Sequence, residues 1–332
     1  TGVARIHMNR IAYGEDHPAA QEMTQATITN ITADDVRRYH ETIARPERLV
    51  IAVRGDFDPS DVRLRLSSML RGWPEWTSEP YELGPRSQRL APGLYHLPLG
   101  QPGLPQALGI MVTRSVPQHH PDAPLLELAS QILGGGEQNS RMSRAIAAAI
   151  GPRANVNLTA FVQNEPKESG LFGAFYQAPT GSALRVGELV LNEYAAIAEG
   201  ASPITEIELE TARTVLRDAM RRQFISASQR LSEMLQAVVL DYPEDPWAAR
   251  LERIESATPT DVARAISEHV KGDPGALLVA GDWSGISASE SAEPEALAER
   301  LGGTVVSLPM LDPMTLEPME RPGPAAPGMP TP

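Results

Sequence analysis

The sequence contains no cysteine among its 332 residues. Disulfides, thiolate metal sites and cysteine nucleophiles are therefore excluded. The sequence also lacks any run of 18 apolar residues, so we expect no membrane-spanning helix. Positive charge is scarce as well, because 29 Lys and Arg stand against 42 Asp and Glu, giving a net charge of −13. A polyanion would be repelled by this charge, which argues against nucleic acid as a partner.

The composition that remains is typical of a globular protein, with 42% hydrophobic and 21% charged residues. A chain of this length has room for two domains, each with its own core. The spacing of apolar residues predicts both helices and strands. The predicted helices cover residues 32–45, 62–70, 123–133, 140–150, 184–197, 204–224, 231–240 and 259–270, and the predicted strands cover 49–53, 107–112, 155–161, 171–177 and 276–280.

Composition also divides the chain into four parts. Residues 76–105 are rich in Pro and Gly without a sustained period, which predicts a linker. From residue 309 onward eight prolines occur in 24 residues, so we expect a disordered tail over 309–332. These boundaries leave a first part over 1–75 and a second, complete domain over 106–308.

An internal repeat links the first part to the second. A shift of 226 positions aligns residues 32–56 with residues 258–282 without a gap, and seven of the 25 positions are identical. A capped helix, an apolar strand and a Gly-Asp stop recur in the same register. We interpret the two stretches as corresponding pieces of a duplicated domain.

The repeat predicts that the first copy is truncated. The second copy begins by about Leu94, so the same shift places the start of the first copy about 130 residues before Thr1. The helices and strand that precede Asp56 cannot close a core alone. We therefore expect a first domain that lacks its N-terminal portion.

Several segments, taken in order, resemble the insulinase-like zinc metallopeptidases, a family that includes the pitrilysins and the mitochondrial processing peptidases. The resemblance extends to about residue 308, and it rests on the order and spacing of the segments together. The matching segments are Tyr-Gly-x-Asp-His-Pro at 13–18, Ile-Thr-Ala-Asp-Asp-Val at 31–36, Pro46, Gly-Asp-Phe-Asp at 55–58, Leu-Gly-Gly-Gly at 133–136, Ser-Arg-Met at 140–142 and Ile-Thr-x-x-Glu-Leu at 204–209.

The resemblance implies an α+β fold made of duplicated domains. Each domain would be an antiparallel sheet with helices packed on one face, and pairs of domains would form half-shells that close around an unfolded peptide. It implies homo- or hetero-dimers with another family subunit. In the full-length family a zinc ion polarises the scissile carbonyl and activates a water, and a glutamate acts as general base.

The zinc helix of that family is missing from this sequence. Its pattern is His-x-x-Glu-His, which places two histidines one helical turn apart. No two of the seven histidines here have that spacing, and the adjacent pair His119-His120 is a poor chelate because neighbouring side chains point to different faces. We interpret that pair, like His17, as turn residues. The chain thus offers no catalytic residue, metal ligand or cofactor site, and we expect any zinc site upstream of Thr1.

A second family feature is also missing. In many members the C-terminal lobe donates an arginine and, seven residues later, a tyrosine that hold the substrate. Aligned through Ser140-Arg141-Met142, those places fall on Ala147 and Ala154. Neither alanine can donate a hydrogen bond or a charge, so the resemblance implies that this lobe has lost the pair.

The glycine run from Gly134 to Gly136 has two compatible interpretations. One is a helix stop in which glycine supplies left-handed backbone geometry. The other is the family's substrate-contacting loop, which would comprise Gly134, Gly135, Gly136, Ser140 and Arg141. A phosphate cradle is disfavoured because the Walker pattern and its lysine are absent.

These observations predict the C-terminal, substrate-enclosing portion of a zinc metallopeptidase that acts on peptides or unfolded proteins, inactive when alone. One alternative is a non-catalytic partner or scaffold subunit of the same family. A second alternative is a peptide-binding shell that uses sheet-edge pairing and has no enzymatic role. Family habit and the lack of cysteine mildly favour a bacterial periplasm or cell envelope.

Overall fold

The computed structural model describes residues 2–73, 89–99, 103–135, 140–166, 168–242, 246–271, 275–289 and 293–319. By contacts the chain divides into two compact units. Unit 1 comprises Thr1–Thr24, Ser87–Leu216 and Arg250–Pro332, and unit 2 comprises Gln25–Arg86 and Arg217–Ala249. This division differs from the boundary predicted near residue 75, because residues 1–24 fall in unit 1. The boundaries predicted from the sequence, 1–75 and 106–308, divide the chain by its two repeat copies, and they stay a prediction.

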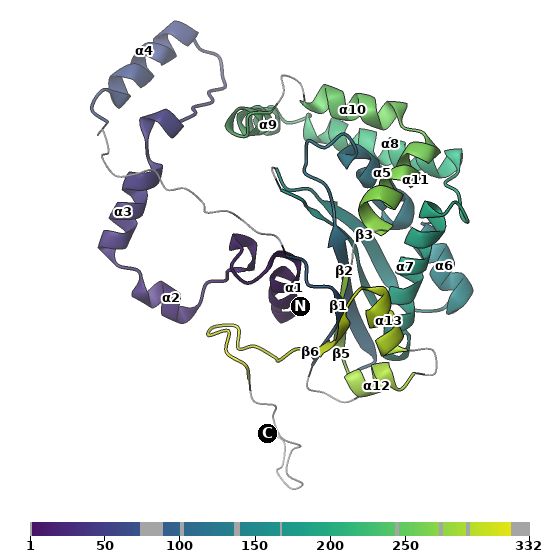
Figure 1. The fold of residues 1–332 in the computed structure, drawn as a ribbon. Coiled ribbons are helices and arrows are strands. Elements are labelled where there is room, and N and C mark those ends of the chain that lie inside the picture. The colour runs from purple at the N-terminus through teal and green to yellow at the C-terminus, as the bar shows by residue number, and fades with distance from the viewer. Residues whose placement is uncertain are drawn as a thin grey trace. The chain divides into compact units, whose positions relative to one another are not determined.

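Unit 1 is built on a six-stranded sheet in the order β3-β4-β2-β5-β1-β6, shown in Figure 1. Its strands are β1 (Gly93–Pro98), β2 (Gln106–Arg114), β3 (Asn157–Gln163), β4 (Leu171–Pro179), β5 (Ala276–Gly281) and β6 (Thr304–Ser307). The pairs β3–β4, β4–β2 and β2–β5 are antiparallel, as expected. However, β1 runs parallel to both β5 and β6. Helices α12 and α13 connect β5 to β6, and such a crossover lets two strands point the same way.

The α+β class predicted from the sequence is confirmed. The helices are α1 (Gly2–Tyr13), α2 (Gln25–Asn30), α3 (Ala33–Ile43), α4 (Pro59–Leu70), α5 (Ala123–Gly134), α6 (Arg141–Ala149), α7 (Ala183–Ala198), α8 (Glu206–Gln223), α9 (Ala227–Val239), α10 (Pro246–Ser256), α11 (Pro259–Ile266), α12 (Trp283–Ser287) and α13 (Pro294–Arg300). A π-helical turn over Ser267–Lys271 extends α11.

Helices cover both faces of the sheet, not one face as the family resemblance implied (Figure 1). Helix α1 packs on one face, where Met8 and Ile11 join a core with alternate residues of β5 such as Leu278. Helix α7 lies against the other face at Gly187, where an added Cβ would come within 2.6 Å of Leu277 Cδ2. Because side chains alternate along a strand, Leu277 and Leu278 belong to the cores on opposite faces of the sheet.

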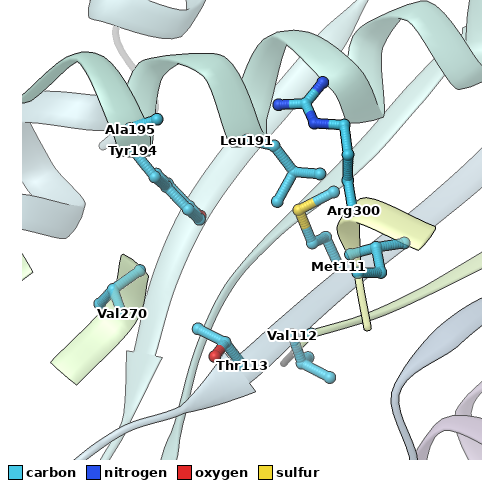
Figure 2. Close-up of a pocket in the computed structure, with 10 residues that line it drawn as sticks. Met111, Val112, Thr113, Leu191, Tyr194, Ala195, Val270 and Arg300 are labelled. Carbon is cyan, nitrogen blue, oxygen red and sulfur yellow. The ribbon is translucent and has the colours of Figure 1, made fainter. Parts of the chain in front are cut away.

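Helix α7 also borders a cavity of about 190 Å³ beside Met111 (Figure 2).

Two stretches predicted to lack structure contain ordered segments. Strand β1 lies inside the predicted linker, and its Leu94 and Leu97 are fully buried. In the predicted tail, Leu311 is buried and forms a bridge with Pro318. The remainder of that tail, from residue 320, lies outside the described residues. Short apolar segments between prolines thus pair with a sheet or pack on a core. The sheet and the core are built from distant parts of the chain, so the local sequence does not reveal them.

Unit 2 contains residues 32–56, which the sequence pattern predicts to be the first copy of a repeat. Helix α3 begins at a capping box, in which Thr32 accepts from the Asp35 N–H and Asp35 accepts from the Thr32 N–H. Neither α3 nor α4 buries a residue. The strand predicted over 49–53 is wrong, because these residues are not paired with any described strand. An apolar run becomes a strand only when neighbouring strands accept its backbone hydrogen bonds.

Candidate functional site

The candidate site lies where α5 ends and α6 begins. Helix α5 ends at Gly134 with Gly135 as its C-cap, and Ser140 is the N-cap of α6, its Oγ accepting from the Ser143 N–H at 3.3 Å. Gly136 lies outside the described residues. The predicted loop segment therefore joins two helices whose ends are fixed by their own caps.

Of the two described glycines in this segment, Gly134 is the one that close packing against a strand requires. A Cβ on Gly134 would come within 2.8 Å of the Ala160 nitrogen and of Leu158 Cδ2 on β3. A Cβ on Gly135 would collide with the Gln131 side chain one turn earlier. The expected left-handed geometry is wrong for Gly135, whose φ is −67°. Gly134 is needed because the end of α5 approaches β3 closely.

Arg141 uses all of its hydrogen-bond donors inside the protein. Its Nε and Nη2 donate to the two carboxylate oxygens of Glu208 at 2.9 and 2.7 Å. Its Nη1 donates to the Ser202 carbonyl and hydroxyl, and Nη2 also donates to the Pro203 carbonyl. Five donors make five bonds, and the side chain is only 6% exposed. Arg141 therefore fixes the start of α6 to the loop before α8.

Glu208 completes this clamp. Burial opposes its negative charge, but hydrogen bonds from Arg141 and Thr205 outweigh burial and lower the pKa of Glu208 to about 2. Thr205 and Glu208 also form a reciprocal cap at the start of α8. The predicted Ile-Thr-x-x-Glu-Leu segment is thus a helix start whose glutamate is tied to α6.

A groove opens beside this clamp. Gly135 and Ser140 line a cavity of about 290 Å³ together with Arg144 and Glu208, which form an ion pair. A neighbouring cavity of about 470 Å³ shares residues of α8 with it. Ile207 lines both cavities and is 81% exposed. The exposed apolar side chain beside the glycine end of α5 suits an extended peptide, and the charged groups of the groove already neutralise each other.

The two alanines predicted at the lost Arg and Tyr positions lie on different elements. Ala147 is half-buried on α6. Ala154 lies in the turn after α6, where its N–H donates to the Gly151 carbonyl at 3.0 Å. Neither methyl group can hold a substrate. The assignment of a lost substrate-binding pair to these positions stays a prediction.

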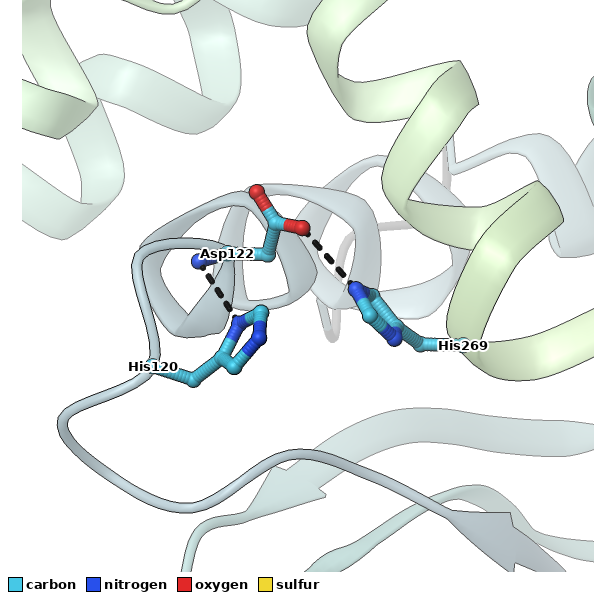
Figure 3. Close-up of side chains that lie close together, drawn as sticks. All are labelled: His120, Asp122 and His269. Carbon is cyan, nitrogen blue, oxygen red and sulfur yellow. Dashed lines mark hydrogen bonds and ion pairs between the residues drawn. The ribbon is translucent and has the colours of Figure 1, made fainter.

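The structure also brings together three potential metal ligands that the sequence left apart. His120, Asp122 and His269 offer ligand atoms within 4.8 Å of one another (Figure 3). His269 Nε2 lies 2.8 Å from Asp122 Oδ2, and His120 Nδ1 accepts from the Asp122 N–H at 3.1 Å. Asp122 and His269 are 147 positions apart, so no local sequence pattern could have identified the cluster.

These residues do not fit the family's zinc helix. His120 follows a turn and His269 lies in the π-helical turn, so the two histidines are not one helical turn apart. In addition, the guanidinium of Arg264 donates to both oxygens of Asp122, at 2.6 and 3.0 Å. It holds the pKa of Asp122 near 2, and its positive charge opposes a divalent cation there. The cluster instead ties the start of α5 to the end of α11.

Another predicted turn residue, His17, is buried and makes specific contacts. Its Nδ1 accepts from the Ala19 N–H and caps a short 3-10 turn. Its Nε2 lies 3.2 Å from Glu168, and its ring stacks on Tyr13 at 4.9 Å. The Asp-His-Pro segment thus fixes the end of α1 to the loop after β3.

Comparison with known proteins identifies the fold and the family. A family model described as the peptidase M16 inactive domain matches residues 30–216, more than half of the chain. The chain belongs to the peptidase M16 family. The resemblance to insulinase-like peptidases is thereby confirmed. The description of the matching M16 domain as inactive is in keeping with the expectation that this chain holds no catalytic zinc.

Solved structures show the same fold at low sequence identity. The M16 inactive domain from Pseudomonas fluorescens is 18% identical with a TM-score of 0.68, covering 84% of this chain and 65% of that one. A protease from Helicobacter pylori is 14% identical with a TM-score of 0.68, covering 84% and 66%. A chain of complex III2 from Candida albicans, with Inz-5 bound, is 13% identical with a TM-score of 0.67, covering 92% and 70%.

The chain matches only part of the length of these solved structures. It spans about two thirds of the length of its structural relatives. A search of curated proteins found no significant match. Within the described parts of the chain, no helix is both long enough and apolar enough to cross a bilayer.

Proposed function

We propose that this M16 chain is the substrate-enclosing, non-catalytic portion of a zinc metallopeptidase that acts on peptides or unfolded proteins. The zinc would be held by another segment or by a partner subunit. In the second case the chain would form a homo- or hetero-dimer. The family match supports the peptidase origin. The groove beside Gly135 and Ser140 supports the contact with substrate.

The observation that carries this proposal is the chemistry of that groove. Its exposed apolar side chain, Ile207, can bury against a peptide, which is favourable by the hydrophobic effect. Its charged groups, Arg144 and Glu208, are paired with each other and are not aligned as a nucleophile and a base. Arg141 is unavailable to substrate because all its donors are used. The groove can therefore hold a peptide, and its described lining residues include no nucleophile paired with a base.

The test is a binding and cleavage assay on the purified chain. We expect a fluorescent, extended, apolar peptide to bind without being cleaved, with or without added zinc. Ile207→Glu should weaken binding about tenfold, equivalent to about 1.4 kcal/mol. The matched control is Met23→Glu, because Met23 is 79% exposed and lines neither cavity of the groove. Equal affinity in both variants would place peptide binding elsewhere, and chelator-sensitive cleavage would refute the non-catalytic role.

A second candidate function is a scaffold subunit without a peptide substrate. It is favoured by the likeness to a chain of complex III2, which covers 92% of this chain. The two functions predict different behaviour in the same assay. A scaffold would form a stable complex with a partner yet leave the peptide unbound at every concentration tested.

A bacterial periplasm or cell envelope remains our proposed location, and fractionation of cells with an antibody to the chain tests it.

A further inference from the structure

A second cavity lies between α7 and the sheet, away from the peptide groove. It measures about 190 Å³ and is enclosed by β2, α7, the segment before β5 and the end of α13 (Figure 2). The apolar side chains of its wall are those of Met111, Leu191, Val270 and Leu301. An engineered apolar cavity of about 150 Å³ is large enough to bind benzene. This cavity can therefore hold a molecule with a single ring.

Two buried hydroxyl groups lie in the wall of the cavity. Tyr194 is 4% exposed and Thr113 is 6% exposed, and among the described residues neither hydroxyl has a hydrogen-bond partner. Thr113 is two residues after Met111 on β2, so both side chains emerge on the same face of the sheet. The Tyr194 ring packs edge-on against Phe172 at 5.6 Å, which holds the hydroxyl in place. Buried hydroxyls without partners are uncommon in folded proteins, and such groups call for an explanation.

The charges near the cavity are already compensated. Arg300 at its rim donates to Asn192 Oδ1 at 2.7 Å and lies 3.6 Å from Glu188. Burial raises the pKa of Tyr194, so its hydroxyl stays neutral and can donate. Among the described residues that line the cavity, Arg300 is the one cation, and it is already paired, which favours a neutral ligand.

We propose that this cavity is a binding site for a small neutral molecule with one ring-sized apolar body and one hydroxyl group, of the phenol or cyclic alcohol class. The ligand oxygen accepts a hydrogen bond from the Tyr194 hydroxyl and donates to Thr113 Oγ1. Its ring displaces water from Met111, Leu191 and Val270. The site is independent of the peptide groove, because no residue lines both cavities.

The experiment uses phenol as the probe and the full chain as the protein. Binding is followed by calorimetry and by the NMR shift of the Met111 methyl group. We expect saturable binding with a dissociation constant on the order of 1 mM or below. Benzene should bind more weakly than phenol, because it leaves both hydroxyls unpaired.

Variants separate the proposed site from adventitious binding. Tyr194→Phe and Thr113→Val each remove one hydroxyl while keeping the shape, so each should weaken phenol about five- to tenfold and leave benzene unchanged. Tyr95→Phe is the matched control, because the Tyr95 hydroxyl already donates to the Ala91 carbonyl outside this cavity. Ala195→Leu fills the cavity and should abolish binding, and circular dichroism shows whether it folds.

Two results would overturn the proposal. Phenol that fails to shift the Met111 methyl at saturating concentration would show that the cavity is closed or filled by water alone. Phenol that binds Tyr194→Phe and Thr113→Val as tightly as the unaltered chain would show that the two hydroxyls do not recognise it.

Discussion

Residues 32–56 and 258–282 carry the same sequence pattern, and comparing them separates local from tertiary causes of structure. Their helices start identically. Thr258 and Asp261 form the same reciprocal cap as Thr32 and Asp35, and the corresponding hydrogen-bond lengths agree within 0.1 Å. Four neighbouring residues contain everything that such a cap requires, so it forms in both places.

The strand segments of the two stretches differ completely. Strand β5 is buried at every residue, between β1 and β2. Its counterpart over 49–53 forms no strand, and Ile51 is 43% exposed. The apolar run is similar in both copies, but only β5 has neighbours that satisfy its backbone. A strand is therefore a property of the sheet and not of its own sequence.

The largest predicted effect contrasts the equivalent positions Leu277 and Ile51. Leu277→Ala removes a fully buried side chain that touches α7, and should lower the free energy of unfolding of unit 1 by about 2–5 kcal/mol. Ile51→Ala removes a half-exposed side chain and should cost about 0.5 kcal/mol. Urea denaturation measures both. Similar losses would mean that residues 49–53 are packed as strongly as β5.

The next effect contrasts Arg264 with its counterpart Arg38. Arg264 bridges to Asp122 on another helix, whereas Arg38 pairs with Asp35 on its own exposed helix. Arg264→Gln leaves a buried carboxylate without its cation and should destabilise unit 1 by about 1–2 kcal/mol, allowing for the partial exposure of Arg264. Arg38→Gln should cost no more than about 0.5 kcal/mol. Thermal unfolding distinguishes the two, and a larger loss for Arg38→Gln would contradict the ranking.

A smaller effect concerns the two cap threonines. Thr258→Ala and Thr32→Ala each remove the same cap and should cost about 1 kcal/mol. Hydrogen exchange should show the loss in α3 alone for Thr32→Ala, because α3 buries no residue. For Thr258→Ala it should extend to the elements that pack on Val262 and Ile266. Identical exchange patterns would show that the two helices are equally embedded.

The smallest effect is the titration of the cap carboxylates. Hydrogen bonds from the Thr32 hydroxyl and N–H lower the pKa of Asp35 to about 2, and those of Thr258 lower the pKa of Asp261. Because the folded pKa of Asp35 is lowered, the ionised cap contributes its full stabilisation at pH values above the ordinary pKa near 3.8. This stabilisation is lost as the pH falls toward 2. Carboxyl NMR should show the Asp35 cap loosening in this range, and the Asp261 cap loosening below the ordinary pKa of an aspartate. Substitution of either threonine by valine should return the pKa of its aspartate toward the ordinary value.

The eight predicted helices correspond to α3 to α9 and to α11, whereas α2, α10, α12, α13 and strand β6 were not predicted. The strands near 107–112, 171–177 and 276–280 were identified because their apolar runs are nearly continuous. Strand β1 was missed because a six-residue segment next to prolines resembles a linker. The substrate-contact role of the loop residues stays a prediction, and the structure uses Arg141 as an internal clamp. The cavity beside Tyr194 has no sequence signal at all.

The sequence by itself determined the family, the helix caps and the absence of a His-x-x-Glu-His pair, because each depends on residues a few positions apart. The tertiary structure decided which apolar runs became strands, which face α1 covers, and how His120, Asp122 and His269 meet. These features depend on contacts between residues far apart in the chain. Such contacts form only where the packing partners are present, and a local pattern does not contain that information.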